Sequence, residues 1–216
     1  MAGKPVGFIP RTPCGFVVLV PVRDHIELLF RLGCYGSSSI DPKITPTFLR
    51  KSHVDSQVEG NEWAEPLKLT ACEAFYLLEN DVMELSWIND KSHLSKEVCW
   101  NVFFSWYNNK YISFAVLFAA YSCLKKQNWI VKQGAALGSH FALYKDDPNK
   151  CHSTYSVLVT TKDKPARWLT ISRLSRVANQ AAKELLLVRV DLIGTETEVA
   201  CPANVTAVII RRFTLN

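Results

Sequence analysis

The spacing of apolar residues along the chain changes near residue 129, from a helical pattern to one that mostly favours strands. Before that point apolar residues recur at intervals of three and four, as one face of a helix requires. The expected helices span residues 25–32, 71–78, 96–107 and 110–127. After it, runs of branched and aromatic residues are separated by glycines and a Pro-Asn turn, which is typical of strands. The expected strands span residues 129–132, 140–145, 155–160, 185–192 and 205–213, with one further helix over 172–183.

Local signals predict where several elements of the first half begin and end. The apolar run 16–20 favours a strand. Asp24 is suited to cap the helix that follows, and Gly33 is suited to end it. Thr70 and Glu73 have the spacing of a capping box, in which each residue binds the backbone of the other.

The Asn-Asn pair at 108–109 interrupts the helical pattern and marks the expected domain boundary. We expect a small N-terminal α/β module over residues 1–107, in which residues 35–66 are mostly loop. We expect a second α/β (α+β) domain over residues 108–216, with a mixed central sheet flanked by helices.

Composition argues against several classes of protein. Of 216 residues, 48% are apolar and 21% are charged, close to the globular average, so wholesale disorder is not expected. The longest apolar run, 111–124, is shorter than the roughly 20 residues of a membrane span. The N-terminus lacks the apolar core of a signal peptide, and the seven cysteines form no CxxC pair. We therefore expect a soluble intracellular protein with reduced cysteines and no membrane partner.

The net charge of +5 is distributed unevenly. Residues 1–107 hold 10 Lys and Arg against 13 Asp and Glu, whereas residues 108–216 hold 15 against 7. The first half therefore carries −3 and the second +8. An asymmetry of this kind points to a polyanionic partner for the second half.

Three cations lie on one side of the helix expected over 172–183, opposite its apolar side: Arg173, Arg176 and Lys183. An ordinary solvated face is one interpretation of this stripe. The other is a binding surface for phosphate, because Arg offers a planar fork of donors and Lys a point charge.

Tyr144 and His152 flank the turn KDDPNK, in which the two aspartates are interpreted as turn residues. Each aromatic side chain alone could be structural. With Lys183, however, they form a set able to cleave RNA without a metal. The reaction needs a base for the ribose 2′-OH, an acid for the departing 5′-oxygen and a cation for the added charge on phosphorus. Histidines titrate near neutral pH and suit the acid, whereas tyrosines are weak bases unless nearby cations favour the phenolate.

The sequence shows no motif for a metal, nucleotide or acyl-transfer site. HExxH, P-loop, GxSxG and GxGxxG patterns are missing, and the five histidines are dispersed. We therefore expect no cofactor and no metal site.

The stretch NWIVKQGAALGSHFALYKDDPNKCHSTYSVLV resembles the core motif of the tRNA-splicing endonuclease family. That motif reads roughly GW-x-hydrophobic-x-x-G, then G-x-[DH]-F-x-LY, then H-[SA]-x-Y-x-V. WLTISRLSRVANQAAKELLLVRV is similar to the next block of the family, and VTAVIIRRF to its C-terminal strand. Upstream, RLGCYG and LKLTACEAFYLLE resemble its short CFG element and its EA-F helix. The sequence around His152 and Lys183 is most similar to the catalytic subunit for the 5′ splice site.

The resemblance implies an endoribonuclease of the lyase type that removes introns from precursor tRNA and leaves 2′,3′-cyclic phosphate and 5′-OH ends. By motif position, Tyr144 would be the general base, His152 the general acid and Lys183 the stabiliser of transition-state charge. Arg176 and Phe213 match the pair that holds an intron base at a neighbouring subunit's site, with Arg173 beside them. Phe213 stands where the family usually has Trp. His140 stands where the family usually has Asp, a change expected to alter hydrogen bonding near Tyr144.

The resemblance further implies a nuclear heterotetramer with other splicing-endonuclease subunits. The apolar strand 205–213 is the expected pairing edge, and the acidic loop 191–198 is a second candidate contact. Two alternatives stay open: the sister subunit for the 3′ site, which shares the three residues, and a non-catalytic RNA-binding or scaffold subunit.

Overall fold

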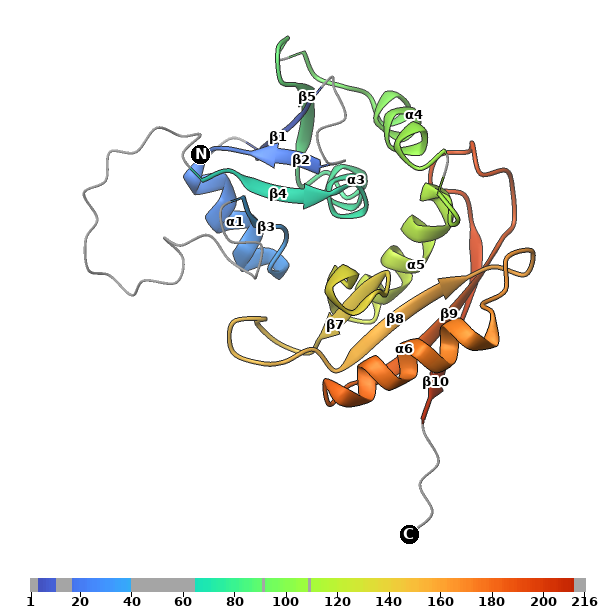
Figure 1. Ribbon diagram of the computed structural model, residues 1–216. Coiled ribbons are helices and arrows are strands. Elements are labelled where there is room, and N and C mark those ends of the chain that lie inside the picture. Colours follow the sequence, from blue (N-terminus) through green and yellow to red (C-terminus); the bar gives the residue numbers. More distant parts are fainter. Residues whose placement is uncertain (1–3, 11–16, 40–64, 91, 109, 212–216) are drawn as a thin grey trace. The chain divides into compact units, whose positions relative to one another are not determined.

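The computed structural model describes residues 4–10, 17–39, 65–90, 92–108 and 110–211. The chain divides into two compact units, Met1–Trp106 and Tyr107–Asn216. Each unit has its own five-stranded sheet (Figure 1).

The first unit is built on five short strands in the order β3-β4-β2-β1-β5. β1 and β5 pair in parallel and the other neighbours pair antiparallel. Only β2 was expected from the sequence. All five strands, β2 included, are at most four residues long, and so short an alternation of buried and exposed positions is a weak signal. The strands are β1 (Val6–Ile9), β2 (Val17–Val20), β3 (Ser37–Ser38), β4 (Leu67–Thr70) and β5 (Glu84–Trp87).

In the described part of this unit, the helices are α1 (Arg23–Gly33), α3 (Ala71–Glu79) and α4 (Lys96–Trp106). The capping box is confirmed, because the Thr70 hydroxyl accepts from the Glu73 N–H at 3.2 Å and a Glu73 carboxylate oxygen accepts from the Thr70 N–H at 2.9 Å. The expected cap at Asp24 is wrong. The helix begins at Arg23, two residues earlier than expected, so Asp24 lies in its first turn, where a negative charge is favourable beside the positive helix end.

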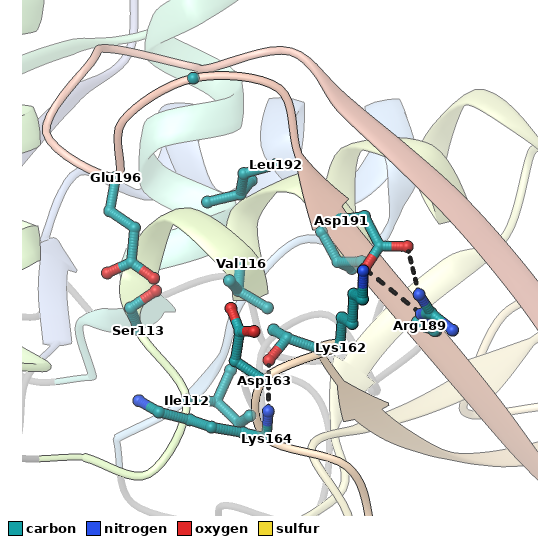
Figure 2. Close-up of a pocket in the computed structure, with 13 residues that line it drawn as sticks. Ile112, Ser113, Val116, Lys162, Asp163, Lys164, Arg189, Asp191, Leu192 and Glu196 are labelled. Atoms are coloured by element: carbon teal, nitrogen blue, oxygen red, sulfur yellow. Dashed lines mark hydrogen bonds and ion pairs between the residues drawn. The ribbon is translucent and has the colours of Figure 1, made fainter.

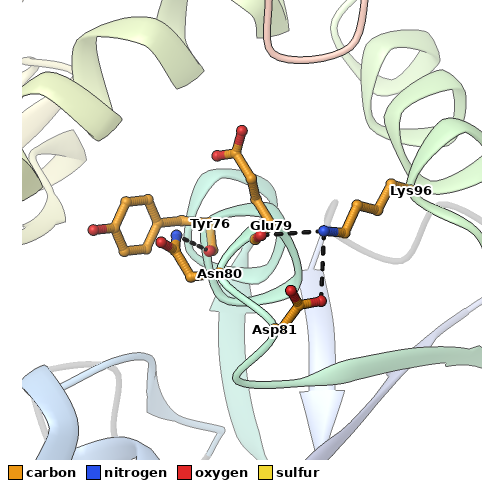
Figure 3. Close-up of polar contacts among 5 residues, drawn as sticks. All are labelled: Tyr76, Glu79, Asn80, Asp81 and Lys96. Atoms are coloured by element: carbon orange, nitrogen blue, oxygen red, sulfur yellow. Dashed lines mark hydrogen bonds and ion pairs between the residues drawn. The ribbon is translucent and has the colours of Figure 1, made fainter.

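Contacts at the C-terminal end of α3 join it to the beginning of α4 (Figure 3). Asn80 donates its side-chain amide to the carbonyl of Tyr76 at 2.7 Å. The Lys96 ammonium donates to the carbonyl of Glu79 at 3.2 Å and pairs with Asp81 at 3.5 Å. Lys96 thereby satisfies a helix-end carbonyl that has no partner inside its own helix.

The second unit contains the mixed sheet that the sequence predicts, in the order β10-β9-β8-β7-β6. β8 and β9 run parallel, and every other neighbouring pair is antiparallel. The strands are β6 (Ile130–Gln133), β7 (Phe141–Tyr144), β8 (Tyr155–Thr160), β9 (Glu184–Leu192) and β10 (Ala203–Ile210). Between β6 and β7 lies the short 3₁₀ helix η1 (Ala135–Leu137).

Two helices cover the two faces of this sheet: α5 (Phe114–Lys126) and α6 (Trp168–Gln180). α6 lies along β8 and β9 (Figure 1), where Leu174 and Ala178 pack with Leu158 and Leu185. The ring of Tyr121 on α5 contacts Phe141 of β7 at 5.9 Å between centroids. Phe141 pairs with Val157, one residue before Leu158, so α5 and α6 lie on opposite faces.

Both helices differ from their expected bounds. α5 begins at Phe114 instead of residue 110. α6 spans 168–180 instead of 172–183. It begins earlier, at the exposed Trp168, and ends before Ala182, whose φ of 53° is incompatible with a continuing right-handed helix. Among the described residues, no helix has the length and apolar character needed to cross a membrane.

Candidate active site

The strand directions bring Tyr144, His152 and Lys183 to one end of the second sheet. Tyr144 is the last residue of β7, and His152 lies three residues before β8 begins. Because β7 and β8 are antiparallel, the end of the first lies beside the start of the second. Because β8 and β9 are parallel, their starts also lie side by side, and Lys183 immediately precedes β9. We call this end of the sheet the catalytic edge.

Two backbone hydrogen bonds tie the three segments together at the catalytic edge. The N–H of Thr154 donates to the carbonyl of Leu143 at 2.7 Å. The carbonyl of Thr154 accepts from the N–H of Glu184 at 3.2 Å. Each bonded residue is one or two positions away from Tyr144, His152 or Lys183, so the peptide groups themselves fix the relative positions of the three segments.

A tight turn returns the chain from Tyr144 to His152. The carbonyl of Asp147 accepts from the N–H groups of Lys150 and Cys151 at 2.8 and 3.0 Å, and its carboxylate accepts from the N–H of Asn149 at 2.9 Å. Asp147 is therefore a turn residue, as the sequence predicts. His152 is exposed and Tyr144 is partly buried, so solvent and a ligand can reach the imidazole.

Lys183 lies in the connection between α6 and β9, and its expected place on the helical stripe is wrong. Its N–H donates to the carbonyl of Ala178 at 2.8 Å, which closes the end of the helix. Its ammonium donates to the carbonyl of Ala181 at 3.1 Å. The left-handed residue Ala182 turns the chain away from the helix axis and delivers Lys183 to the catalytic edge.

The other expected RNA-binding residues are not part of the catalytic edge as described. Arg173 and Arg176 are exposed on α6. Phe213 lies outside the described residues.

An ion pair that the sequence analysis missed lies at the catalytic edge. Arg211 follows β10 and donates its Nε to the Glu184 carboxylate at 2.5 Å. This hydrogen bond, with the charge of Glu184, raises the pKa of Arg211. Because Ile210 pairs antiparallel with Leu185, the next residues, Arg211 and Glu184, lie beside each other. Aligning the last two strands in this register predicts the ion pair from the sequence.

His140 does not lie near Tyr144, contrary to expectation, because it precedes the other end of β7. Its Nδ1 accepts a hydrogen bond from the N–H of Val159 at 2.9 Å. Burial lowers the pKa of His140, which favours the neutral imidazole that this bond requires. His140 therefore acts in holding β7 beside β8.

A cavity of about 500 Å³ opens at the far end of β8 and β9 from the catalytic edge (Figure 2). It is lined by both signs of charge, including Lys162, Lys164 and Asp163 from the loop after β8 and Glu196 from the acidic loop. Arg189 in its wall is already paired with Asp191 at 3.0 Å. The positive and negative side chains that line the cavity therefore balance, whereas the charged side chains of α6 are all basic. In the described part of the chain, no three His, Cys, Asp or Glu side chains gather closely enough to hold a metal ion.

Comparison with known proteins assigns both units to models of one family. Residues 15–100 match the model described as tRNA intron endonuclease, N-terminal domain. Residues 114–197 match the model described as tRNA intron endonuclease, catalytic C-terminal domain.

Individual relatives are similar over different lengths. The chain is 38% identical over 81 residues to tRNA-splicing endonuclease subunit Sen2-1 of Arabidopsis thaliana, which covers 36% of this chain and 34% of the relative. It is 32% identical over 83 residues to subunit Sen2 of Gallus gallus, and the match covers 35% of this chain and 18% of the relative. It is 25% identical over 177 residues to the tRNA-splicing endonuclease of Saccharolobus solfataricus, and the match covers 82% of this chain and 87% of the relative. The matched part thus spans about a third or less of the plant and animal relatives.

Proposed function

Because this chain belongs to the tRNA intron endonuclease family, we propose that it is the catalytic subunit that cuts precursor tRNA at the 5′ splice site. The observation that carries this proposal is the convergence of Tyr144, His152 and Lys183 at the catalytic edge. A tyrosine, a histidine and a lysine meet there at three adjacent strand ends, and the imidazole is open to solvent.

The proposed reaction is an internal transesterification. Tyr144 removes the proton of the ribose 2′-OH, and the 2′-oxygen attacks the adjacent phosphorus. The bond from phosphorus to the 5′-oxygen breaks, and His152 gives its proton to that oxygen. Lys183 stabilises the added negative charge on the phosphoryl oxygens. The products are a 2′,3′-cyclic phosphate and a 5′-OH, and no metal takes part.

Electrostatics at the catalytic edge favour this chemistry. Lys183 and Arg211 bring two cations to it, and Glu184 neutralises part of the charge of Arg211. Tyrosines are weak bases, so we expect most of the rate enhancement to come from positioning and from the field of these cations.

We propose that the protein acts in a heterotetramer with other splicing-endonuclease subunits. β10 is the edge strand of its sheet and exposes Val208 and Ile209, at 56% and 40%. An exposed apolar edge is suited to pairing with a strand of another subunit. In that assembly, Arg176, Arg173 and Phe213 would contact RNA. We also propose that the protein is located in the nucleus, and imaging of the tagged chain tests this location.

The test is cleavage by the complex purified with its associated subunits. An intron-containing precursor tRNA, labelled at its 5′ end, is cut, and both cleavage positions and their end groups are mapped. We expect His152→Ala to abolish the 5′ cut and leave the 3′ cut, whereas His93→Ala, a change of an exposed histidine in the first unit, leaves both.

Other results would contradict the proposal in different ways. Loss of the 3′ cut alone in His152→Ala would assign the chain to the other splice site. Undiminished cleavage at both sites, with weaker RNA binding in Lys183→Ala, would make it a non-catalytic subunit.

A further inference from the structure

Trp168 exposes a large aromatic surface at the start of α6. Its exposed fraction is 78%, and that of the neighbouring Leu169 is 81%. The other tryptophans of the described residues, at positions 87, 100, 106 and 129, are buried or partly buried. Burying an indole ring is strongly favourable, so an exposed one marks a surface suited to a ligand or partner.

The segment around Trp168 is basic throughout. Residues 164–183 contain five cations and no Asp or Glu: Lys164, Arg167, Arg173, Arg176 and Lys183. This segment of twenty residues has a charge of +5, equal to the net charge of the whole chain. Such a surface is complementary to a polyanion and unsuited to an uncharged or basic partner.

Trp168 and Arg176 lie on the same side of α6. The buried side is marked by Leu174 and Ala178, which pack on the sheet. Trp168 and Arg176 are eight residues apart, so at 100° per residue they differ by about 80° around the axis and by about 12 Å along it. That length corresponds to between three and four stacked nucleotides at about 3.4 Å each.

The exposed side of α6 leads to the catalytic edge. The helix ends at Gln180, and the chain continues through Ala182 to Lys183. A strand of RNA whose phosphates lie near Lys183 and Arg176 would therefore reach Trp168 at the opposite end of the helix.

We propose that Trp168 is an RNA-binding residue that stacks on a base of a single-stranded segment of the substrate, while Arg173 and Arg176 bind the neighbouring phosphates. This inference rests on the proposed function in taking RNA as the substrate, and it adds a contact site distant from the reacting phosphate. Stacking on an aromatic ring beside a basic track is how single strands are bound without regard to sequence. A protein partner is disfavoured because Trp168 lies among cations with no carboxylate between residues 164 and 183.

The test measures binding and cleavage separately in the full complex. The probes are a fluorescein-labelled single-stranded RNA 12-mer and a precursor tRNA made uncleavable by 2′-deoxy substitution at both cut positions. We expect Trp168→Ala to raise Kd for both probes by about 5- to 140-fold, the range for loss of one stacked base. Trp168→Phe keeps Kd within about threefold, because a phenyl ring still stacks.

Two matched controls separate stacking from general apolar contact. Leu169→Ala removes an equally exposed apolar side chain without a ring, and Tyr111→Ala removes an aromatic ring, 65% exposed, over which Lys164 lies at 5.9 Å. We expect both to keep Kd within about twofold. A loss in Leu169→Ala equal to that in Trp168→Ala would overturn the proposal.

The remaining outcomes distinguish this inference from the proposed function. At saturating RNA, Trp168→Ala should make the 5′ cut within about twofold of the wild-type rate, whereas His152→Ala should bind normally and fail to make that cut. Unchanged Kd in Trp168→Ala overturns the inference alone. Unchanged Kd with loss of a co-purifying subunit overturns it in favour of a protein contact. A wild-type complex that binds RNA through Trp168 but cuts nothing contradicts the proposed function alone.

Discussion

The backbone N–H of Thr154 donates to the carbonyl of Leu143 at 2.7 Å and so joins the segment carrying His152 to the strand carrying Tyr144. The bond belongs to peptide groups, so only a change that removes the N–H breaks it directly. The carbonyl of Thr154 also accepts a hydrogen bond from the N–H of Glu184, which extends the connection to the segment that carries Lys183.

Thr154→Pro should uncouple the proposed acid from the proposed base. Proline has no N–H, so the bond to Leu143 is lost, with an expected destabilisation of about 1–3 kcal/mol. We expect single-turnover cleavage to fall at least tenfold, since misplacement of catalytic groups is costly. Thr154→Ala keeps the N–H and is the matched control, expected to cleave near the wild-type rate. Equal rates for the two variants in precursor-tRNA cleavage would contradict this role of the bond.

Gly134→Ala should destabilise the second unit for steric reasons. A Cβ there would lie 2.2 Å from the Ser139 hydroxyl oxygen and 2.7 Å from the Phe141 carbonyl oxygen, so the chain entering β7 must shift. We expect a loss of about 1–3 kcal/mol in urea unfolding. Gly138→Ala is the comparison, because its Cβ would meet only Leu174 at 3.5 Å and its cost, about 1 kcal/mol, comes from its φ of +71°. A larger loss in Gly138→Ala would contradict the steric argument.

His140 should make the stability of the second unit fall on mild acidification. Burial lowers the pKa of His140 in the folded state, so the unfolded chain binds the proton more readily. The contribution of neutral His140 to the free energy of unfolding is complete above the pKa of the unfolded chain, about 6.5. It is lost as the pH falls from there toward the lowered pKa of the folded state. The free energy of unfolding changes by at most about 1.4 kcal/mol per pH unit, which is the limit for one proton.

His140→Asn provides the control for this titration, because its amide oxygen can accept from Val159 but does not titrate in this range. Urea unfolding at pH 5 to 7.5 should therefore show a steeper decline for the wild type than for His140→Asn. Parallel curves would show that His140 does not contribute.

Arg176→Gln should weaken RNA binding in a salt-dependent manner. Loss of one phosphate contact lowers the slope of log Kd against log salt by about one, with little dependence on RNA sequence. Arg189→Gln is the matched control, because that side chain is paired with Asp191 at the far end of the sheet. Anisotropy titrations from 50 to 300 mM KCl test the difference, and equal slopes for the two variants would contradict a role of α6 in RNA binding.

Ile209→Lys should prevent assembly with other subunits. A charged side chain on the exposed edge strand β10 opposes pairing with a second strand. We expect the variant to elute from size-exclusion chromatography at the mass of the free chain, with an unchanged circular dichroism spectrum. Leu32→Lys places the same charge on another exposed apolar residue, on α1 and 53% exposed, and should leave assembly intact.

The second sheet was more predictable from sequence than the first. β8 is long enough that its bounds matched the expectation, Tyr155 to Thr160. β1, β4 and β5 were not expected, although β2, β6 and β7 are equally short with four residues each; whether such a segment forms a strand depends on partners far away in the sequence.

Two features of the catalytic edge could not be read from local patterns. Lys183 continued the helical spacing of α6, but α6 ends at Gln180 and Ala182 adopts a left-handed conformation, which no residue pattern indicated. The pair of Glu184 and Arg211 joins residues 27 positions apart and depends on strand register. Conversely, Tyr144 and His152 were found because a turn of polar residues separates them by only eight positions.

The peptide-group connection through Thr154 has a consequence for how this family can diverge. Positions held by main-chain hydrogen bonds do not require particular side chains around them, so neighbouring residues can be exchanged while the geometry is kept. We therefore expect a protein only 25% identical, such as the archaeal relative, to present its reacting groups in the same arrangement. By the same reasoning, the catalytic edge could be transplanted between distant relatives as a block of three strand ends, leaving each recipient its own surface for choosing a substrate.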